Sequence, residues 1–180
     1  MMQIETQRLR LAPFSTFDFD RFVQDMLTDS RVVEFYYSYR DLDDTGEIRA
    51  RALADFWNEF EESRAAHGLQ TWAAYEKGAH AALVGWCGLL HGELSDQYGG
   101  PELQYMIAGD FHGKGLATEL AQAVLQHAAD EKITESVIAT VDIPNRGSVR
   151  VLEKSGFELE GQIHAYGSDE MYLYRNALLR

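Results

Sequence analysis

The junction at residues 105–118 constrains this chain more than any other feature of its sequence. An apolar strand end leads into a short polar turn, and Gly113 and Gly115 flank Lys114 directly before a helical pattern. The first N–H groups of a helix have no partner within the helix, and the helix dipole adds partial positive charge there. Glycines let an anion approach these groups closely. The junction therefore predicts either a phosphate cradle or a strand-to-helix turn that needs glycine only for its geometry.

Two common phosphate loops fit this junction poorly. A Walker A loop follows G-x-x-x-x-G-K-S/T, but Gly109 precedes Gly113 by one residue too few, and Gly115 replaces the magnesium-binding Ser or Thr. A dinucleotide fingerprint needs a third small residue where this chain has Thr118. The spacing therefore argues against a P-loop nucleotide hydrolase.

The composition predicts one globular domain spanning residues 1–180. The chain is 46% hydrophobic and 25% charged, and its apolar runs are too short to span a membrane. The N-terminus has no secretory signal, and the one cysteine, Cys87, cannot form an intrachain disulfide. We therefore expect a cytoplasmic protein without a membrane partner, in which Cys87 is a small core residue rather than a nucleophile.

The net charge is strongly negative: 16 basic and 29 acidic residues give −13. Nucleic acid is disfavoured as a direct ligand, because its binding usually requires a basic face. Two interpretations of the charge remain open, attraction of a cationic partner and simple solubility.

The pattern of elements is β-α-α-β-β-β-α-β-α-β-β, which is typical of an α+β domain with a mixed sheet. Ser15 and Asp18 form a capping box that opens the first helix, and Gly68 ends the second. We expect strands at residues 6–13, 71–76, 82–90, 102–107, 134–142, 157–164 and 170–176. The later helices are expected at residues 45–66, 116–130 and 145–154.

Two segments carry further expectations about the sheet. Residues 6–13 alternate, with Leu9 and Leu11 on one side and arginines on the other, which is typical of an edge strand. The polar segment 91–100 separates two strands and predicts a hairpin connection.

Two motifs in this order of elements resemble the GNAT superfamily of acyl-CoA-dependent N-acetyltransferases. Residues 112–117, HGKGLA, are similar to the acetyl-CoA loop Q/R-x-x-G-x-G/A, with His112 in the basic or amide position. Residues 145–157, NRGSVRVLEKSGF, resemble the segment N-x-x-S-x-x-x-L-E-K-x-G-F. The segments 6–11 and 169–174 also resemble the branch that contains RimJ, RimL and spermidine acetyltransferase. Each motif alone is modest evidence, and the two together are strong.

The resemblance implies a GNAT-like fold and a site for acetyl-CoA. Its mixed, mostly antiparallel sheet has about seven strands, about four flanking helices and a splay between strands 4 and 5. Backbone groups near the end of strand 4 pair with the pantetheine arm, and loop N–H groups hold the pyrophosphate. His112 either contacts phosphate or is a surface histidine, and Asn145 donates to pantetheine or caps the next helix. The implied cofactor-binding residues are Met106, Ile107, His112, Gly113, Lys114, Gly115, Leu116, Ala117, Thr118 and Asn145.

The implied reaction is direct acetyl transfer from the thioester to a primary amine, without a covalent enzyme intermediate. The amine must first lose a proton, since such amines have pKa values of ~8 to ~10.4. Glu102 is the preferred base, and a carboxylate that orients the substrate is an equally weighted alternative. Ser148 is the candidate acid for the leaving thiolate, with a helix N-terminal hydroxyl as its alternative. Many relatives carry a tyrosine for this step where this chain has Leu152.

Aromatic residues are the candidates for binding the acceptor. The run at residues 35–39 lies between helices and predicts a wall around a cation, whereas Trp57 is expected in the core. The substrate-binding candidates are Tyr36, Tyr37, Tyr39 and Tyr166. The acceptor is a protein N-terminus, a polyamine or another small-molecule amine. No metal is expected, and a homodimer is expected only by analogy. The alternative function is a non-catalytic acyl-CoA-binding sensor or assembly module, which the leucine at position 152 favours slightly.

Overall fold

A computed structural model describes residues 3–36, 39, 42, 44–78, 81–166 and 170–178 of the chain. Its strands are β1 (Ile4–Glu5), β2 (Leu9–Pro13), β3 (Thr71–Glu76), β4 (Leu83–Leu90), β5 (Glu102–Ile107), β6 (Ser136–Asp142), β7 (Glu158–Ile163) and β8 (Met171–Ala177). They form one sheet in the order β1-β2-β3-β4-β5-β6-β8-β7. All neighbouring pairs are antiparallel except β5 and β6, which are parallel. The mixed, mostly antiparallel sheet expected from the sequence is confirmed.

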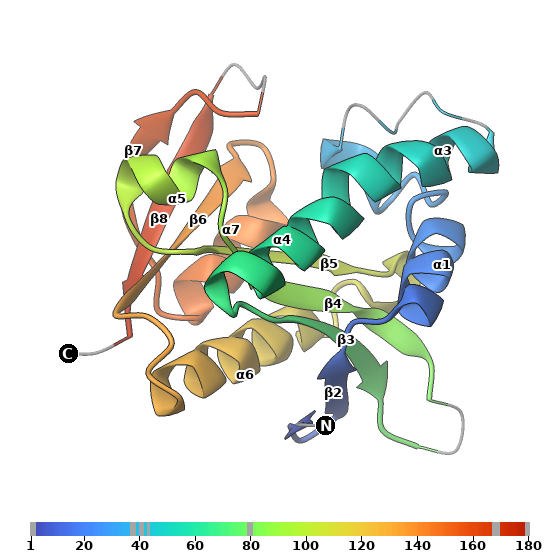
Figure 1. Ribbon diagram of the computed structural model, residues 1–180, viewed down its shortest axis with the longest axis horizontal. Coiled ribbons are helices and arrows are strands. Elements are labelled where there is room, and N and C mark those ends of the chain that lie inside the picture. Colours follow the sequence, from blue (N-terminus) through green and yellow to red (C-terminus); the bar gives the residue numbers. More distant parts are fainter. Residues whose placement is uncertain are drawn as a thin grey trace.

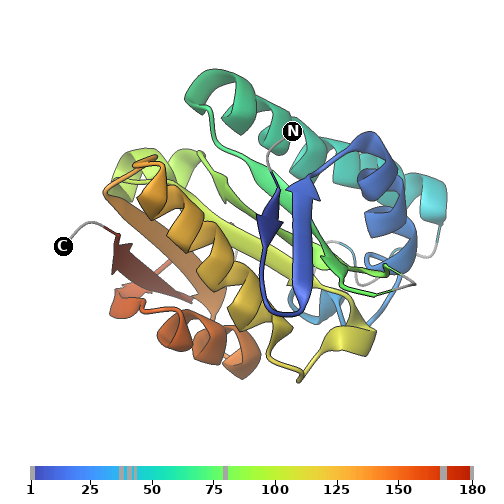
Figure 2. The same ribbon diagram turned by 90° about the horizontal axis from the view of Figure 1, so that it is seen from below.

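Helices cover both faces of this sheet. They are α1 (Thr16–Asp25), α3 (Thr45–Ala52), α4 (Asn58–His67), α5 (Glu93–Tyr98), α6 (Leu116–Asp130) and α7 (Arg146–Lys154). Short helical turns are η1 (Val33–Phe35), η2 (Leu53–Trp57) and η3 (Gly109–Phe111). Helices α1, α3 and α4 bury their apolar sides on one face, and α6 and α7 on the other (Figure 1, Figure 2). In the described part of the chain, no helix is long and apolar enough to cross a membrane.

The N-terminal strand differs from the predicted edge strand at residues 6–13. The chain turns at Thr6, and β2 begins only at Leu9. The N–H of Thr6 donates to the carbonyl of Leu9 at 2.9 Å, and the Thr6 hydroxyl accepts from the N–H of Leu9 at 2.8 Å. This turn brings β1 alongside β2, so that β1 forms the edge, and the described part of the chain has an eight-stranded sheet where about seven strands were expected. Leu9 and Leu11 are fully buried, as their alternation predicts.

The connection between β4 and β5 also differs from expectation. The two strands are antiparallel neighbours, as predicted, but residues 91–100 contain helix α5 rather than a simple hairpin turn. The Ser95 hydroxyl accepts from the N–H of Gly92 at 3.2 Å, and Gly99 ends the helix with a φ of 75°. Serine and glycine favour both turns and helix ends, so the polar composition did not distinguish the two.

The long helix predicted at residues 45–66 is present, but a π-helical turn interrupts it. Helix α3, turn η2 and helix α4 follow one another without a break, and the N–H of Asn58 donates to the carbonyl of Leu53. Gly68 ends α4 with a φ of 69°, as predicted, and Trp57 is partly buried in the core. A π-turn changes which side chains share a helix face, and such turns are frequent at functional sites.

The first helix and the core follow the sequence closely. Ser15 accepts from the N–H of Asp18, and the Asp18 side chain accepts from the N–H of Ser15, which completes the predicted capping box of α1. Cys87 is fully buried in the core on the α6 side, as predicted. Burial raises the pKa of its thiol, which argues further against a nucleophile.

The sheet splays between β5 and β6, as expected. These strands pair only at Glu102 and Ile138, and then they diverge. Beyond that position, the edge of β5 that faces β6 has no strand partner within the described residues. The divergence opens a gap in the middle of the sheet, between the two layers of helices.

Candidate active site

A cavity of about 500 Å³ lies where β5 and β6 separate. Its walls come from these strands, from α7, from the helix that runs through α3, η2 and α4, and from the segment before β8. The described residues that line it include no lysine, arginine or histidine. Its carboxylates are Asp55, Glu59, Glu102 and Asp142. Because a cleft of one charge attracts the opposite charge, this cavity is suited to a cation.

Glu102 lies in the β5 wall of the cavity and is only 4% exposed. Its Oε1 accepts a hydrogen bond from the Thr140 hydroxyl at 2.6 Å. Its Oε2 accepts from the Tyr166 hydroxyl at 2.6 Å and from the Gln104 amide at 3.2 Å. Buried carboxylates require such donors. These three contacts hold the carboxylate of Glu102 in one orientation.

Tyr166 reaches Glu102 from the segment between β7 and β8. Its φ of 53° lies in the left-handed region, which is uncommon for a residue other than glycine. Tyr166 is 63% exposed overall, but desolvation of its hydroxyl and the charge of Glu102 raise its pKa, so the hydroxyl stays protonated and donates a hydrogen bond to Glu102. Such backbone outliers cluster at ligand sites and active sites. This geometry supports the predicted place of Tyr166 at the acceptor site.

Two of the three tyrosines predicted near residue 37 line the same cavity. Tyr36 is partly buried, and burial raises its pKa, which keeps the ring neutral. Tyr39 is 2% exposed, and its hydroxyl donates to Asp55 at 2.8 Å. Tyr39 therefore contributes to the wall and also positions a carboxylate. Tyr37 lies outside the described residues.

Glu59 is a cavity residue that the sequence reasoning missed. It lies in α4, directly after the π-helical turn, and is partly buried. Burial and the charge of Glu102 raise the pKa of Glu59 from its ordinary 4.5 to about 7. The available signal was the spacing of Asp55 and Glu59, two carboxylates four residues apart on a helix that also carries buried aromatic side chains.

The predicted anion cradle has the geometry that its glycines indicated. Gly113 and Gly115 have φ values of 73° and 76°, and α6 begins at Leu116. Among the described residues, the N–H groups of residues 113–118 donate no hydrogen bond to another protein group. The space where a Cβ of Gly113 would lie is open to at least 4 Å. Free donors at a helix N-terminus, with open space in front of them, fit the pyrophosphate of acetyl-CoA.

An ion-pair network fixes this loop from outside. The Nη1 of Arg8 donates to the carbonyl of Lys114 at 2.8 Å, and its Nε donates to Glu119 at 2.6 Å. Glu119 also accepts from the Thr6 hydroxyl at 2.6 Å and from the N–H of Arg8 at 2.8 Å. The turn between β1 and β2 is therefore fastened to the loop and to the first turn of α6. Neither Arg8 nor Glu119 was predicted to have this role.

His112 is engaged with the strand that precedes the loop. Its Nε2 lies 2.8 Å from the carbonyl oxygen of Ile107, so this carbonyl already has a partner. Ile107 and Met106 are buried at the end of β5, on the stretch that has separated from β6. A Cβ on Gly85 would collide with the carbonyl oxygen of Met106, so glycine is needed in β4 at this point. Contact between His112 and phosphate stays a prediction.

Ser148 and Tyr105 bring hydroxyl groups to the α7 end of the cavity. Asn145 caps α7 by accepting from the N–H of Ser148 at 3.0 Å, and both residues line the cavity. Leu152 is 1% exposed and lines it one turn later. The Tyr105 hydroxyl lies 3.4 Å from the carbonyl oxygen of Ser148. Tyr105 was not predicted. Strand alternation places its side chain on the other face of β5 from Glu102, but the splay lets both side chains line the cavity.

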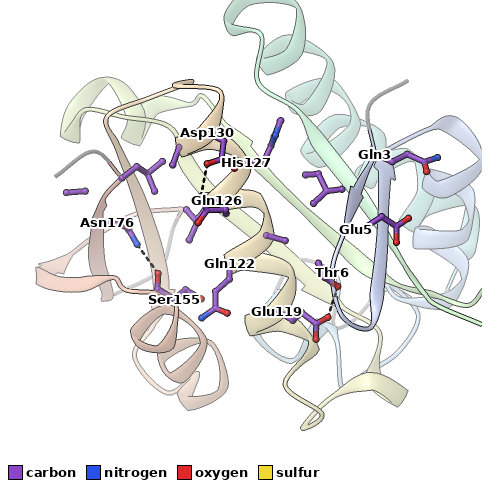
Figure 3. A pocket seen from close by; sticks show the side chains of 16 residues that line it. Gln3, Glu5, Thr6, Glu119, Gln122, Gln126, His127, Asp130, Ser155 and Asn176 are labelled. Carbon is purple, nitrogen blue, oxygen red and sulfur yellow. Dashed lines mark hydrogen bonds between the residues drawn. The ribbon is translucent and has the colours of Figure 1, made fainter.

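A shallower groove of about 860 Å³ follows the outer side of α6 (Figure 3). None of the predicted site residues lines it, and many of its polar groups already have protein partners. The hydrogen-bonded pairs drawn there are Thr6–Glu119, Gln126–Asp130 and Asn176–Ser155. Within the described residues, no group of three or more His, Cys, Asp or Glu is arranged to hold a metal ion.

Known proteins share both the sequence pattern and the architecture of this chain. YkkB of Bacillus subtilis (strain 168), whose function is uncharacterised, is 27% identical over 164 residues, which are 91% of this chain and 90% of that protein. A GNAT-family acetyltransferase from Bacillus anthracis has a TM-score of 0.74 at 21% identity, covering 98% of this chain and 99% of that one. RimL, a ribosomal L7/L12 alpha-N-protein acetyltransferase in complex with coenzyme A, has a TM-score of 0.73 at 14% identity, covering 98% of each chain.

The family assignment comes from the sequence itself. Residues 8–158 match the profile of the acetyltransferase (GNAT) domain, which is most of the chain. The matched region includes the loop, the splayed strands and the cavity residues from Asp55 to Ser148. This chain belongs to the GNAT acetyltransferase family and is an N-acetyltransferase.

Proposed function

We propose that this enzyme transfers an acetyl group from acetyl-CoA to a primary amine that enters the acidic cavity as a cation. The observation that carries the proposal is the position of this cavity, at the gap between β5 and β6. The N–H cradle of residues 113–118 follows β5, so an anionic donor and a cationic acceptor meet at one place. Direct transfer between two substrates requires this proximity.

The donor half of the site relies on backbone groups. When bound, acetyl-CoA supplies an activated thioester. The N–H groups of residues 113–118 hold its pyrophosphate, and the free edge of β5 near Met106 binds its pantetheine arm as an added strand. A backbone N–H near Met106 or Ile107 stabilises the thioester oxyanion, an effect worth about 3 kcal/mol. Ser148 protonates the leaving thiolate from the α7 side.

The acceptor half relies on side chains. Glu102 lies in the β5 wall of the cavity and meets the incoming amine, with Thr140 and Tyr166 holding its carboxylate. Tyr36, Tyr39 and Tyr166 border the cavity and provide aromatic surface for a cation. A protein N-terminus, a polyamine and another small-molecule amine all carry the required charge. The role of Tyr37, the cytoplasmic location and the homodimer stay predictions.

The test combines titration with a screen for thiol release. Isothermal titration should show acetyl-CoA binding, and at least one amine from a panel of peptide N-termini, polyamines and aminoglycosides should release free CoA. Absence of binding at millimolar acetyl-CoA would contradict the proposal. Tight binding without CoA release from any amine would instead favour the non-catalytic sensor, the alternative that Leu152 favours.

A further inference from the structure

We infer that Glu59 accepts the proton of the attacking ammonium group, while Glu102 holds the amine in place. This inference rests on the proposed function and assigns separate tasks to two carboxylates of one cavity. Both residues line the space at the splay, but their surroundings differ. Two carboxylates in unlike environments commonly divide the work of binding and proton transfer.

The surroundings of Glu102 suit it to binding rather than to accepting a proton. Three donors already occupy its oxygens, two of them at 2.6 Å, and the residue is 4% exposed. A proton placed on Glu102 would compete with the hydroxyl groups of Thr140 and Tyr166. Displacing either donor would leave a polar group without its partner inside the protein, which is costly. Glu102 is therefore better suited to remain a fixed negative charge.

The surroundings of Glu59 suit it to proton transfer. Within the described residues, its carboxylate accepts no hydrogen bond, so protonation breaks none of the contacts seen there. It is only partly buried, so a captured proton has a path to water. Its pKa of about 7 is far better matched to an amine than that of an ordinary glutamate.

Every charged group that shapes Glu59 acts in the same direction. Burial raises its pKa first, followed by the charges of Glu102 on β5 and of Glu62 and Asp55 on its own helix. From the other walls, besides desolvation, the charge of Glu59 also raises the pKa of Tyr36 and of Tyr166, so both hydroxyl groups stay protonated. Asp55 lies within the π-helical turn and Glu59 lies just after it, so this turn sets how the two side chains meet the cavity.

The proposed step balances in atoms and charge. One proton of the ammonium group passes to Glu59, which leaves a neutral amine beside Glu102. The amine nitrogen forms a bond to the acetyl carbon as the bond between that carbon and sulfur breaks. Ser148 gives its hydroxyl proton to the thiolate, which leaves as the free thiol, and takes up a second nitrogen-bound proton in its place. Glu59 then releases its proton to water, so the reaction yields an amide, a thiol and one proton.

The test is the pH dependence of kcat/KM with two amines of different pKa. A limb that stays in place when the amine changes belongs to the enzyme. The wild type should lose activity tenfold per pH unit below about pH 7, and Glu59→Gln should remove this limb and lower the plateau about 100-fold. Glu62→Gln, an exposed carboxylate on the same helix, should retain the limb. Glu102→Gln should keep a limb but move it to lower pH, because the charge of Glu102 helps raise the pKa of Glu59, and it should raise KM for the amine.

Three outcomes separate the inference from the proposed function. If Glu59→Gln keeps the wild-type limb and plateau, the inference is wrong while the transferase function stands. If Glu59→Gln binds acetyl-CoA normally but only its amine KM rises, the residue binds substrate and the inference is also wrong. If the wild type releases no CoA with any amine, the proposed function itself fails. Titration with acetyl-CoA shows in each case that the variant is folded.

Discussion

The loop at residues 113–118, proposed to bind acetyl-CoA, and the cavity between β5 and β6, proposed to bind the acceptor, are built in different ways. The loop presents backbone N–H groups from six consecutive residues, 113–118, and its shape depends on two glycines with positive φ. The cavity presents side chains from η1, from Tyr36 and Tyr39, from η2, α4, β5, β6 and α7, and from the segment before β8. The donor site is thus local in sequence, whereas the acceptor site exists only after the chain has folded.

Because the two sites use different groups, the sites for the two substrates can change independently. Backbone N–H groups do not depend on side-chain identity, so the same loop can bind acetyl-CoA whatever the acceptor is. Side chains gathered from distant elements can change one at a time, so the acceptor can change while the loop is preserved. Substitutions on the acceptor side should therefore alter kinetics toward the amine alone, and substitutions in the loop should alter acetyl-CoA binding alone.

The largest effect is expected at Glu102. Glu102→Gln should lower kcat/KM for the amine about 100-fold, because hydrogen bonds to a charged group are worth about 1.5–3 kcal/mol and the amine loses its buried anion. The affinity for acetyl-CoA should not change. Steady-state kinetics with each substrate varied in turn measure kcat/KM, and titration measures the affinity for acetyl-CoA. A comparable loss of acetyl-CoA affinity would show that the two halves are not separable.

The next effect concerns the loop and has a matched control elsewhere in the chain. Gly113 and Gly68 have φ values of 73° and 69°, and neither has an atom within 4 Å of its Cβ position. Alanine at either position should cost about 1–2 kcal/mol of stability, because L-residues disfavour this conformation. Only Gly113→Ala should weaken acetyl-CoA binding, by about tenfold. Equal weakening by Gly68→Ala would indicate a general loss of structure rather than a cradle at residues 113–118.

The same contrast explains what the sequence could predict. The strand at residues 102–107, the helix from 116 and the loop between them follow from local patterns, and all three are present. The turn at Thr6 and helix α5 were missed because polar residues suit several local structures, and distant contacts select one.

The acceptor site was predictable only in part. Tyr36, Tyr39 and Tyr166 were expected from their residue types, and they do line the cavity. Glu59 was missed because its facing depends on a π-helical turn that no apolar periodicity reveals. Its raised pKa arises first from burial and then from the charge of Glu102, which lies 43 residues later in the sequence. Such properties belong to the tertiary structure and are absent from any local pattern.

A smaller effect is expected where the N-terminal turn supports the loop. Arg8→Ala removes the contacts of the guanidinium group with Lys114 and Glu119. KM for acetyl-CoA should therefore rise about threefold, because an exposed ion pair contributes under about 1 kcal/mol. KM for the amine should not change. Arg8→Lys should not restore the contacts, since an ammonium group cannot span both partners as the planar fork does.

The control for Arg8 is Arg21, which forms an exposed pair with Asp25 on α1. Arg21→Ala should leave both KM values unchanged, although it also removes a partly exposed arginine from an ion pair. If Arg8→Ala changes only the thermal stability, the network holds the fold together and has no bearing on the loop.

The smallest effect is a pH-dependent gain of stability at Glu59. Its pKa in the folded chain, about 7, lies above the ordinary 4.5, so folding favours the protonated form and its charge opposes folding. This penalty is complete above about pH 7 and disappears as the pH falls through about 4.5. Glu59→Gln should therefore raise the free energy of unfolding at pH 8 by about 1 kcal/mol, since water screens the partly exposed side chain, or about 2–4 °C in Tm.

Calorimetry at pH 8 and at pH 4.5 measures this difference, and the gain should vanish at the lower pH. Glu62→Gln should change Tm little at either pH, because that side chain is exposed. Destabilisation of Glu59→Gln at pH 8 would mean that a cation compensates Glu59 in the folded chain, which would contradict its role as the proton acceptor. A carboxylate whose charge weakens the fold is best explained by a function at the proposed acceptor site. The backbone N–H groups of the loop bring no buried charge and so no comparable cost to the free energy of unfolding.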